Sequence, residues 1–208
     1  MKIPFPSTRQ AILEKLISEG LIKTENGKYH ITNLCGILFA KDLKYFETLS
    51  RKAARVIVYD GINRVKTIRE QQGGRGYAVG FGGLINFINT QLPSNEEIGK
   101  AFRETVRVYP ELAIRELVAN ALIHQDFSER GTAPMIEIFS DRIEITNPGI
   151  PLIKTIRFID EYQSRNEKLA SFMRRVGICE EKGSGIDKVI FQVELYQLPA
   201  PAFEDMEK

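Results

Sequence analysis

One polar stripe runs along a segment that is otherwise apolar. From Pro110 to about His124 the sequence predicts a helix, on which Glu116, Asn120 and His124 recur at every fourth position. A carboxylate can act as a general base, and an amide oxygen can bind Mg²⁺. The remaining positions are apolar on most sides, which is typical of a buried helix, so these polar side chains need partners. The alternative for Glu116 and Asn120 is the polar edge of a packed helix, and for His124 a structural role is favoured.

Two glycine-containing segments follow this helix. Asn147-Pro148-Gly149 comes directly after an antiparallel hairpin predicted at 135–139 and 142–146. Gly183-Ser184-Gly185 enters a helix that is predicted from Ile186 to about Tyr196. Backbone amides at such an entry can hold an anion. Each segment also has an ordinary interpretation, as a turn and as a strained helix entry, so only their order along the chain indicates a site.

In this order the pieces resemble the Bergerat-type ATPases, which include gyrase, heat-shock chaperone, histidine kinase and mismatch-repair ATPases. The resemblance implies that Glu116 is the catalytic base and that Asn120 binds Mg²⁺ carried by ATP. Asn147 stands where that superfamily has an adenine-binding Asp, and an Asn accepts the same bond without the charge. The implied nucleotide-binding residues are Asn120, Asn147, Gly149, Gly183, Ser184 and Gly185.

Three longer segments narrow the resemblance. Residues 115–127 (RELVANALIHQDF), 141–145 (DRIEI) and 181–186 (EKGSGI) resemble the RecG-related transcriptional regulators of bacteria. The resemblance implies a divergent GHKL-type, nucleotide-binding regulatory domain in a homo-oligomer, with ATP binding favoured over hydrolysis. DNA contact is expected mainly through domains that this chain lacks. The alternative function is a catalytically inactive DNA-binding or oligomerisation scaffold.

Helicase activity is not expected from this chain alone. A helicase motor needs a P-loop lysine that holds the β- and γ-phosphates, and the sequence has no GxxxxGK[ST] pattern. Six glycines between Gly73 and Gly83 lack the spacing of a phosphate loop, so a flexible or tightly turned connector is predicted there.

The elements that must position the site predict an α+β protein. Residues 100–200 are expected to form a two-layer, Bergerat-like α/β sandwich with a mixed, largely antiparallel sheet, and 201–208 a truncated tail. Residues 1–95 are expected to form a smaller α/β region, with the boundary at Pro93-Ser94-Asn95. Within it, 8–33 predict a winged-helix-like helix and hairpin, capped by Ser7 or Thr8 and turning at Asn26-Gly27. Further predictions are a strand at 54–59 and helices at 84–92 and 166–176.

Composition sets the broad class. The 208 residues are 43% hydrophobic and 27% charged, which is typical of a globular chain. With 29 basic and 27 acidic residues the net charge of +2 does not by itself indicate a nucleic-acid partner. Cys35 and Cys179 are far apart and in no metal-binding spacing. Neither a signal peptide nor an apolar run long enough for a membrane span is recognised, so a reduced, cytoplasmic location is expected.

Overall fold

A four-stranded sheet forms the centre of the protein. The computed structural model describes residues 6–98, 103–179 and 185–205. The strand order is β4-β3-β7-β8, with β3 (Arg55–Tyr59) parallel to β7 (Met135–Ile138). Each outer strand pairs antiparallel with its neighbour, β4 (Thr67–Gln72) with β3 and β8 (Ile143–Thr146) with β7. The predicted α+β class with a mixed, largely antiparallel sheet is therefore confirmed.

The sheet joins both parts of the chain that the sequence separated at residues 93–95. Strands β3 and β4 come before that point and β7 and β8 come after it. One hydrophobic core likewise contains Val56 from the first part and Ile136 from the second. The parallel β3–β7 pair is thus the structural link between the two parts.

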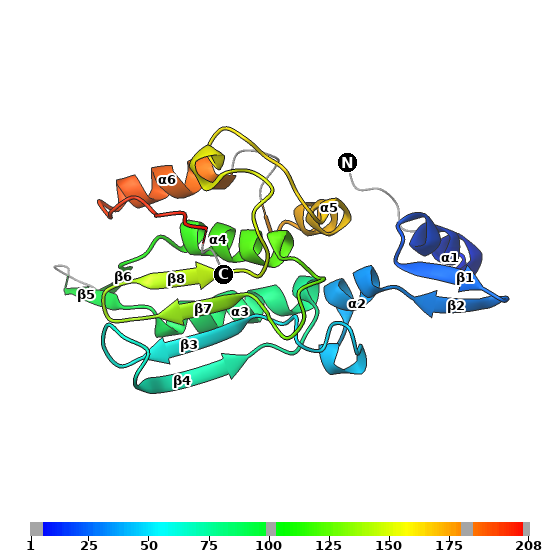
Figure 1. The fold of residues 1–208 in the computed structure, drawn as a ribbon, viewed down its shortest axis with the longest axis horizontal. Helices are drawn as coiled ribbons and strands as arrows, with labels where there is room; N and C mark the ends of the chain where they lie inside the picture. The colour runs from blue at the N-terminus through cyan, green and yellow to red at the C-terminus, as the bar shows by residue number, and fades with distance from the viewer. Residues whose placement is uncertain (1–5, 99–102, 180–184, 206–208) are drawn as a thin grey trace.

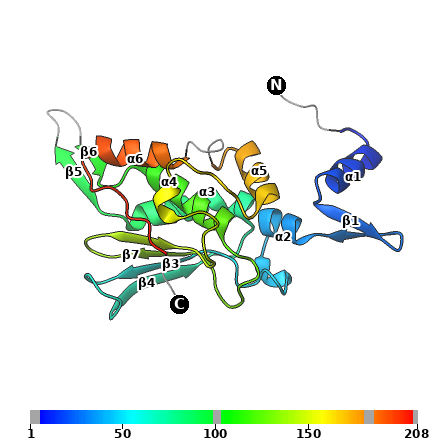
Figure 2. The ribbon, with the colours of Figure 1, turned by 45° about the horizontal axis from the view of Figure 1, so that its top comes forward.

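Helices cover one face of the sheet, which gives two layers (Figures 1 and 2). Helices α3 (Tyr77–Gln91) and α4 (Glu111–His124) lie along the strands (Figure 1). Helices α2 (Asn33–Phe39) and α5 (Glu167–Arg175) continue this layer past the ends of the strands, where α2 contacts both α3 and α5 (Figure 1). A further helix, α6 (Gly185–Leu195), packs against α4 through Ala113, Val189 and Val193. Because α4 lies between the sheet layer and α6, it is apolar on most of its sides, as its sequence predicted.

The helix and hairpin predicted within 8–33 are confirmed as α1 (Arg9–Ser18), β1 (Ile22–Glu25) and β2 (Lys28–Ile31). Thr8 is the N-cap of α1, because its side-chain oxygen accepts a hydrogen bond from the Ala11 amide at 3.2 Å. This N-terminal module (residues 8–31) lies at one end of the molecule (Figure 1). Glu19 at the end of α1 connects it to the main body through an ion pair with Arg175 of α5, at 2.8 Å.

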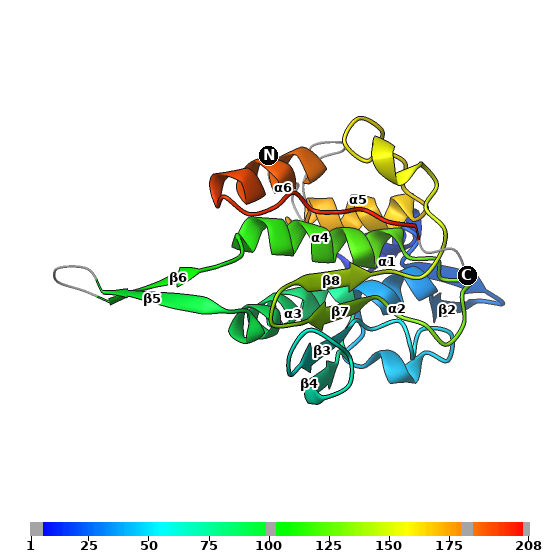
Figure 3. The ribbon, with the colours of Figure 1, turned by 60° about the vertical axis from the view of Figure 1, so that its left-hand side comes forward.

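Three features differ from the sequence predictions. Strand β4 was not predicted, and 94–107 form a hairpin of β5 (Ser94–Ile98) and β6 (Arg103–Arg107) that projects from the body (Figure 3). The expected connector at 73–83 is wrong from residue 77 onward, because α3 begins at Tyr77. A Cβ built on Gly76 would lie 2.6 Å from the Leu38 backbone, so glycine allows α3 to start against α2. Packing there outweighs the poor helix propensity of glycine.

Two short 3-10 turns, Leu43–Tyr45 and Thr155–Arg157, complete the fold. Among the described helices, none is long and apolar enough to cross a membrane.

Candidate functional site

A cavity of about 850 Å³ lies between α4, the start of α6, the end of β8 and the loop 147–165. Its volume is within the range of small-molecule binding sites. The predicted site residues among its lining residues are Glu116, Asn120, Asn147, Gly149 and Gly185. Two others, Gly183 and Ser184, lie outside the described residues.

Helix α4 supplies the polar stripe that the sequence singled out. Glu116, Asn120 and His124 all line the cavity, while Val118, Ala119 and Leu122 of the same helix are buried in protein. Glu116 is only 5% exposed, so its carboxylate is held in a site largely shielded from bulk water. The spacing of four residues therefore brings three polar groups to one wall.

The start of α6 lies directly against the Glu116 side chain. A Cβ built on Gly185 would be 3.0 Å from the carboxyl carbon of Glu116 and 3.2 Å from its Cγ, and still closer to an oxygen of the carboxylate. Any larger residue at position 185 must move Glu116 or α6. Glycine is thus required by the close approach of a helix N-terminus to a buried carboxylate.

The turn after β8 is held by equally close contacts. Gly149 has φ of +105°, and a Cβ there would lie 2.5 Å both from the Asp126 Cβ and from Arg165 Nη1. The Asp126 amide donates a hydrogen bond to the Pro148 carbonyl at 2.7 Å. Asn147 is exposed on the same turn and faces the cavity.

Arg165 and Asn166, which the sequence did not single out, fix this end of the cavity. Arg165 donates to Asp126 Oδ2 at 2.8 Å and to the Ile150 carbonyl at 2.6 Å. Asn166 donates from Nδ2 to the Ile123 and Gln125 carbonyls, at 2.7 and 2.8 Å. We call these contacts the 165–166 clasp, since they tie the end of α4 to the turn after β8. No motif of the sequence points to it, because its partners lie about 40 residues away.

Lys52 is buried against the segment 126–129, which follows α4. It is 3% exposed, and its ammonium group donates to the Glu129 carbonyl at 2.5 Å and to the Asp126 carbonyl at 3.3 Å. Burial lowers the pKa of Lys52, and the charges of Asp126 and Glu129 oppose that shift. No pattern in the sequence predicts a buried lysine at this position.

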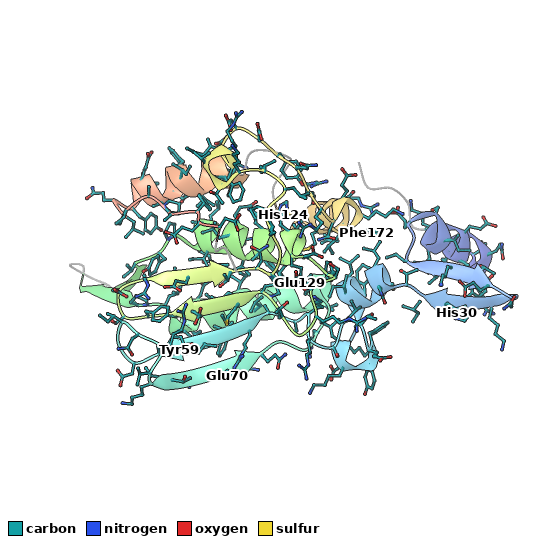
Figure 4. All side chains as sticks on the ribbon, in the orientation of Figure 1. His30, Tyr59, Glu70, His124, Glu129 and Phe172 are labelled. Carbon is teal, nitrogen blue, oxygen red and sulfur yellow. The ribbon has the colours of Figure 1, made fainter. Side chains whose placement is uncertain are left out.

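His124 lies at the end of α4, beside the loop that closes the cavity (Figure 4). Burial lowers the pKa of His124, and the positive charge of Arg165 adds to the effect, so the neutral imidazole is favoured. Its ring meets Tyr162 edge-on at 6.1 Å, and the Tyr162 hydroxyl accepts a hydrogen bond from Arg174 at 3.1 Å. This arrangement gives His124 a polar, partly aromatic environment, which suits a structural role as well as ligand contact.

Acidic groups outnumber basic ones around the cavity. Among the described lining residues Arg165 and Arg174 are basic. The acidic ones are Glu116, Glu129, Glu161, Glu204 and Asp205. Yet no group of three or more His, Cys, Asp or Glu residues within the described ranges could hold a metal ion.

Comparison with known proteins supports the resemblance in the C-terminal part. Residues 131–208 match the family model described as "Putative ATP-dependent DNA helicase recG C-terminal". The fold is similar to a crystal structure of the DIP2311 protein from Corynebacterium diphtheriae, with a TM-score of 0.74, 18% identity and 93% of this chain covered. The chain spans 38% of that protein's length. No curated protein matches the chain.

Proposed function

We propose that the cavity binds a nucleotide of the ATP type together with Mg²⁺, as the ligand-sensing part of a RecG-related, DNA-associated transcriptional regulator. The observation that carries the proposal is the contact between Gly185 and Glu116. It brings a helix N-terminus, which favours anions, to a buried carboxylate that can orient or activate water. The family match supports the proposal for the part of the cavity that residues 131–208 form, which includes Gly185 but not Glu116.

Each predicted residue has a role in this proposal. Asn120 would hold the Mg²⁺ that the nucleotide carries, through its side-chain oxygen. Glu116 orients water if hydrolysis occurs, and Gly183, Ser184 and Gly185 hold phosphate oxygens through their amides. Asn147 accepts a hydrogen bond from the adenine amino group, beside Gly149. Ligand binding is the proposed function, and hydrolysis is secondary.

The acidic lining of the cavity should make nucleotide binding depend on Mg²⁺. Since the described lining has five acidic and two basic residues, an uncompensated triphosphate would be repelled. Removing Mg²⁺ is therefore expected to abolish binding rather than weaken it slightly.

Isothermal titration with a non-hydrolysable ATP analogue tests the proposal. We expect Mg²⁺-dependent binding by the parent chain, a lower affinity for Asn120→Ala, and nearly unchanged binding for Glu116→Gln. Asn147→Asp should tighten binding by about 1–2 kcal/mol, because the adenine amino group then donates to a charged acceptor. If neither the parent chain nor Asn147→Asp shows binding at millimolar nucleotide, the proposal is contradicted.

A DNA-binding scaffold is the second candidate, favoured by the N-terminal module. The module is a helix and a hairpin at one end of the molecule (Figure 1). Leu16 of α1 packs against the core, while Arg9, Gln10, Glu14 and Lys15 are exposed to a partner. Salt-dependent DNA binding that is unaffected by nucleotide would support this candidate. Neither candidate includes strand separation by the isolated chain.

A further inference from the structure

The chain reverses direction at the end of α6 through a defined cap. The Leu198 amide donates to the Val193 carbonyl at 3.0 Å, and the Gln197 amide donates to the Glu194 carbonyl at 2.9 Å. Gln197 has φ of +55°, and Leu198 packs against the cluster that contains Val193. This is the Schellman arrangement, with Gln197 in the position that glycine usually takes. It directs the following residues back over α4.

These following residues form part of the cavity wall. Phe203, Glu204 and Asp205 are among its lining residues, and Phe203 meets Phe158 edge-to-face at 5.5 Å. Figure 3 shows the segment running along α4, between α6 and β8. Pro199 and Pro201 restrict its backbone, which lowers the entropy lost when it lies in place.

We infer that residues 197–205 form a strap that closes the ligand cavity, latched by Phe203 against Phe158. The latch joins two opposite walls, since Phe158 belongs to the loop 147–165 and the strap continues from α6. The cavity has its volume of about 850 Å³ with the strap in place, so the strap is a wall and not an occupant. The inference rests on the proposed ligand site, although the latch itself can be tested without any ligand.

A closing strap predicts an effect on ligand exchange. Release of a bound nucleotide requires the Phe203–Phe158 contact to open, so loss of the contact should speed dissociation by roughly 2- to 10-fold, the range expected for one aromatic pair. Phe203 is half-buried and follows the last helix, so Phe203→Ala is expected to leave the fold intact. Stopped-flow displacement of a fluorescent ATP analogue measures the rate.

The absence of tryptophan from the sequence gives a direct probe of the latch. In Phe203→Trp the new indole is the single tryptophan and can still pack against Phe158. The matched control is Phe191→Trp, since Phe191 on α6 is 62% exposed. We expect acrylamide to quench the Phe203→Trp protein at least 2-fold less efficiently than the control. Adding Phe158→Ala should raise that quenching toward the control value.

The outcomes separate the strap from the ligand. Equal quenching of the Phe203→Trp and Phe191→Trp proteins, with no response to Phe158→Ala, overturns the strap whatever the cavity binds. Protection of the indole without any nucleotide binding in calorimetry supports the strap and overturns the proposed ligand. Protection together with faster nucleotide release from Phe203→Ala supports both.

Discussion

Two glutamates are buried on opposite sides of the protein, and their surroundings differ. Glu137 on β7 is 1% exposed. Its carboxylate accepts hydrogen bonds from Arg64 Nε at 2.6 Å, from Arg64 Nη2 at 2.9 Å and from the Tyr59 hydroxyl at 3.0 Å. Glu116 on α4 is 5% exposed, lines a large cavity and lies against Gly185. Burial is thus similar for the two carboxylates, but only Glu116 faces a space that can admit a ligand.

The partners of Glu137 also seal it from solvent. Tyr59 stacks on Phe139 with ring centres 4.9 Å apart, and the Arg142 guanidinium lies 4.0 Å from the centre of the same ring. The hydrogen bond from Arg64 is the largest cause of the lowered pKa of Glu137. A buried carboxylate that the fold encloses on all sides is structural, whereas one that lines a cavity is a candidate for function. Burial alone does not separate the two.

The largest expected effect is the loss of Arg64. Arg64→Ala leaves Glu137 buried without its cation, and we expect a loss of about 3 kcal/mol in the free energy of unfolding. Since the folded-state pKa of Glu137 is lowered, the stabilisation is complete above the ordinary pKa and is lost as pH falls. The difference between parent and variant should therefore shrink in acid, as measured by urea denaturation from pH 7 to pH 3.

Arg55→Ala is the matched control on the same sheet. Arg55 pairs with Glu70 at 2.8 Å, but both side chains are nearly half exposed. We expect this variant to lose less than about 1 kcal/mol. Arg64 is itself 57% exposed, so the two pairs differ in the carboxylate, which is 1% exposed in Glu137 and 46% exposed in Glu70. Similar losses for Arg64→Ala and Arg55→Ala would show that burial of the carboxylate does not decide the cost of losing its arginine.

The next effect concerns the other glutamate. Gly185→Ala places a Cβ against the Glu116 carboxylate, and we expect a loss of about 2 kcal/mol from overpacking, measured by thermal or urea denaturation. Glu116→Ala in the same chain should restore much of that loss by removing the obstructing group. Additive effects of the two substitutions would exclude the direct contact.

Gly82→Ala controls for the general effect of a glycine substitution. Gly82 lies within α3, and nothing is within 4 Å of a Cβ built on it. Because alanine favours a helix over glycine, this variant should gain up to about 1 kcal/mol. A gain in stability for Gly82→Ala and a loss for Gly185→Ala would show that the loss at Gly185 comes from its contact with Glu116.

Local patterns explain which parts of this comparison could be predicted. The stripe at Glu116 and Asn120 follows from helical spacing within one segment, and the β7–β8 hairpin follows from alternation around a turn. The register confirms that hairpin, since Ile138 pairs with Ile143. Both features depend on residues that are close in the sequence.

Long-range contacts explain what could not be predicted. Arg64 and Glu137 are separated by 73 residues, and β3 and β7 pair across a similar distance. No periodicity specifies which distant strand or cation completes such a pair. The connector predicted at 73–83 was wrong for a related reason, because the start of α3 depends on a distant contact of Gly76 with the Leu38 backbone of α2. The roles of the predicted site residues stay predictions until a ligand is tested.

The third effect tests the end of the cavity opposite the Gly185 contact. Arg165→Ala removes the hydrogen bonds to Asp126 and to the Ile150 carbonyl, and we expect a loss of about 1.5 kcal/mol in stability. Arg165→Lys should restore only part, since a lysine cannot reproduce the two-pronged geometry. Arg157→Ala, which removes exposed ion pairs in the same loop, is the control and should cost less. An equal cost for Arg157→Ala would show that the 165–166 clasp does not hold the turn.

The smallest expected effect concerns a third carboxylate, that of Glu19, which is paired but lies close to solvent. Hydrogen bonds from Arg175 and then Lys15 lower the pKa of Glu19 to about 2. Its contribution to stability is therefore complete above the ordinary pKa of 4.5 and is lost as pH falls toward 2. Because Arg175 is about half exposed, Glu19→Gln should cost less than about 1 kcal/mol at pH 7 and nothing near pH 2.

Amide hydrogen exchange in α1 measures this effect best, since Glu19 joins the N-terminal module to α5 and its loss should loosen the module before the sheet. Glu14→Gln is the control, because Glu14 lies on the same helix and accepts a hydrogen bond from Gln10 within that helix. Faster exchange throughout α1 in Glu19→Gln alone is expected, and the difference should disappear in acid. Equal exchange in both variants at pH 7 would mean that apolar contacts hold the module in place. In this protein the loss of a paired carboxylate would then lower stability only where the carboxylate is buried, as in Glu137.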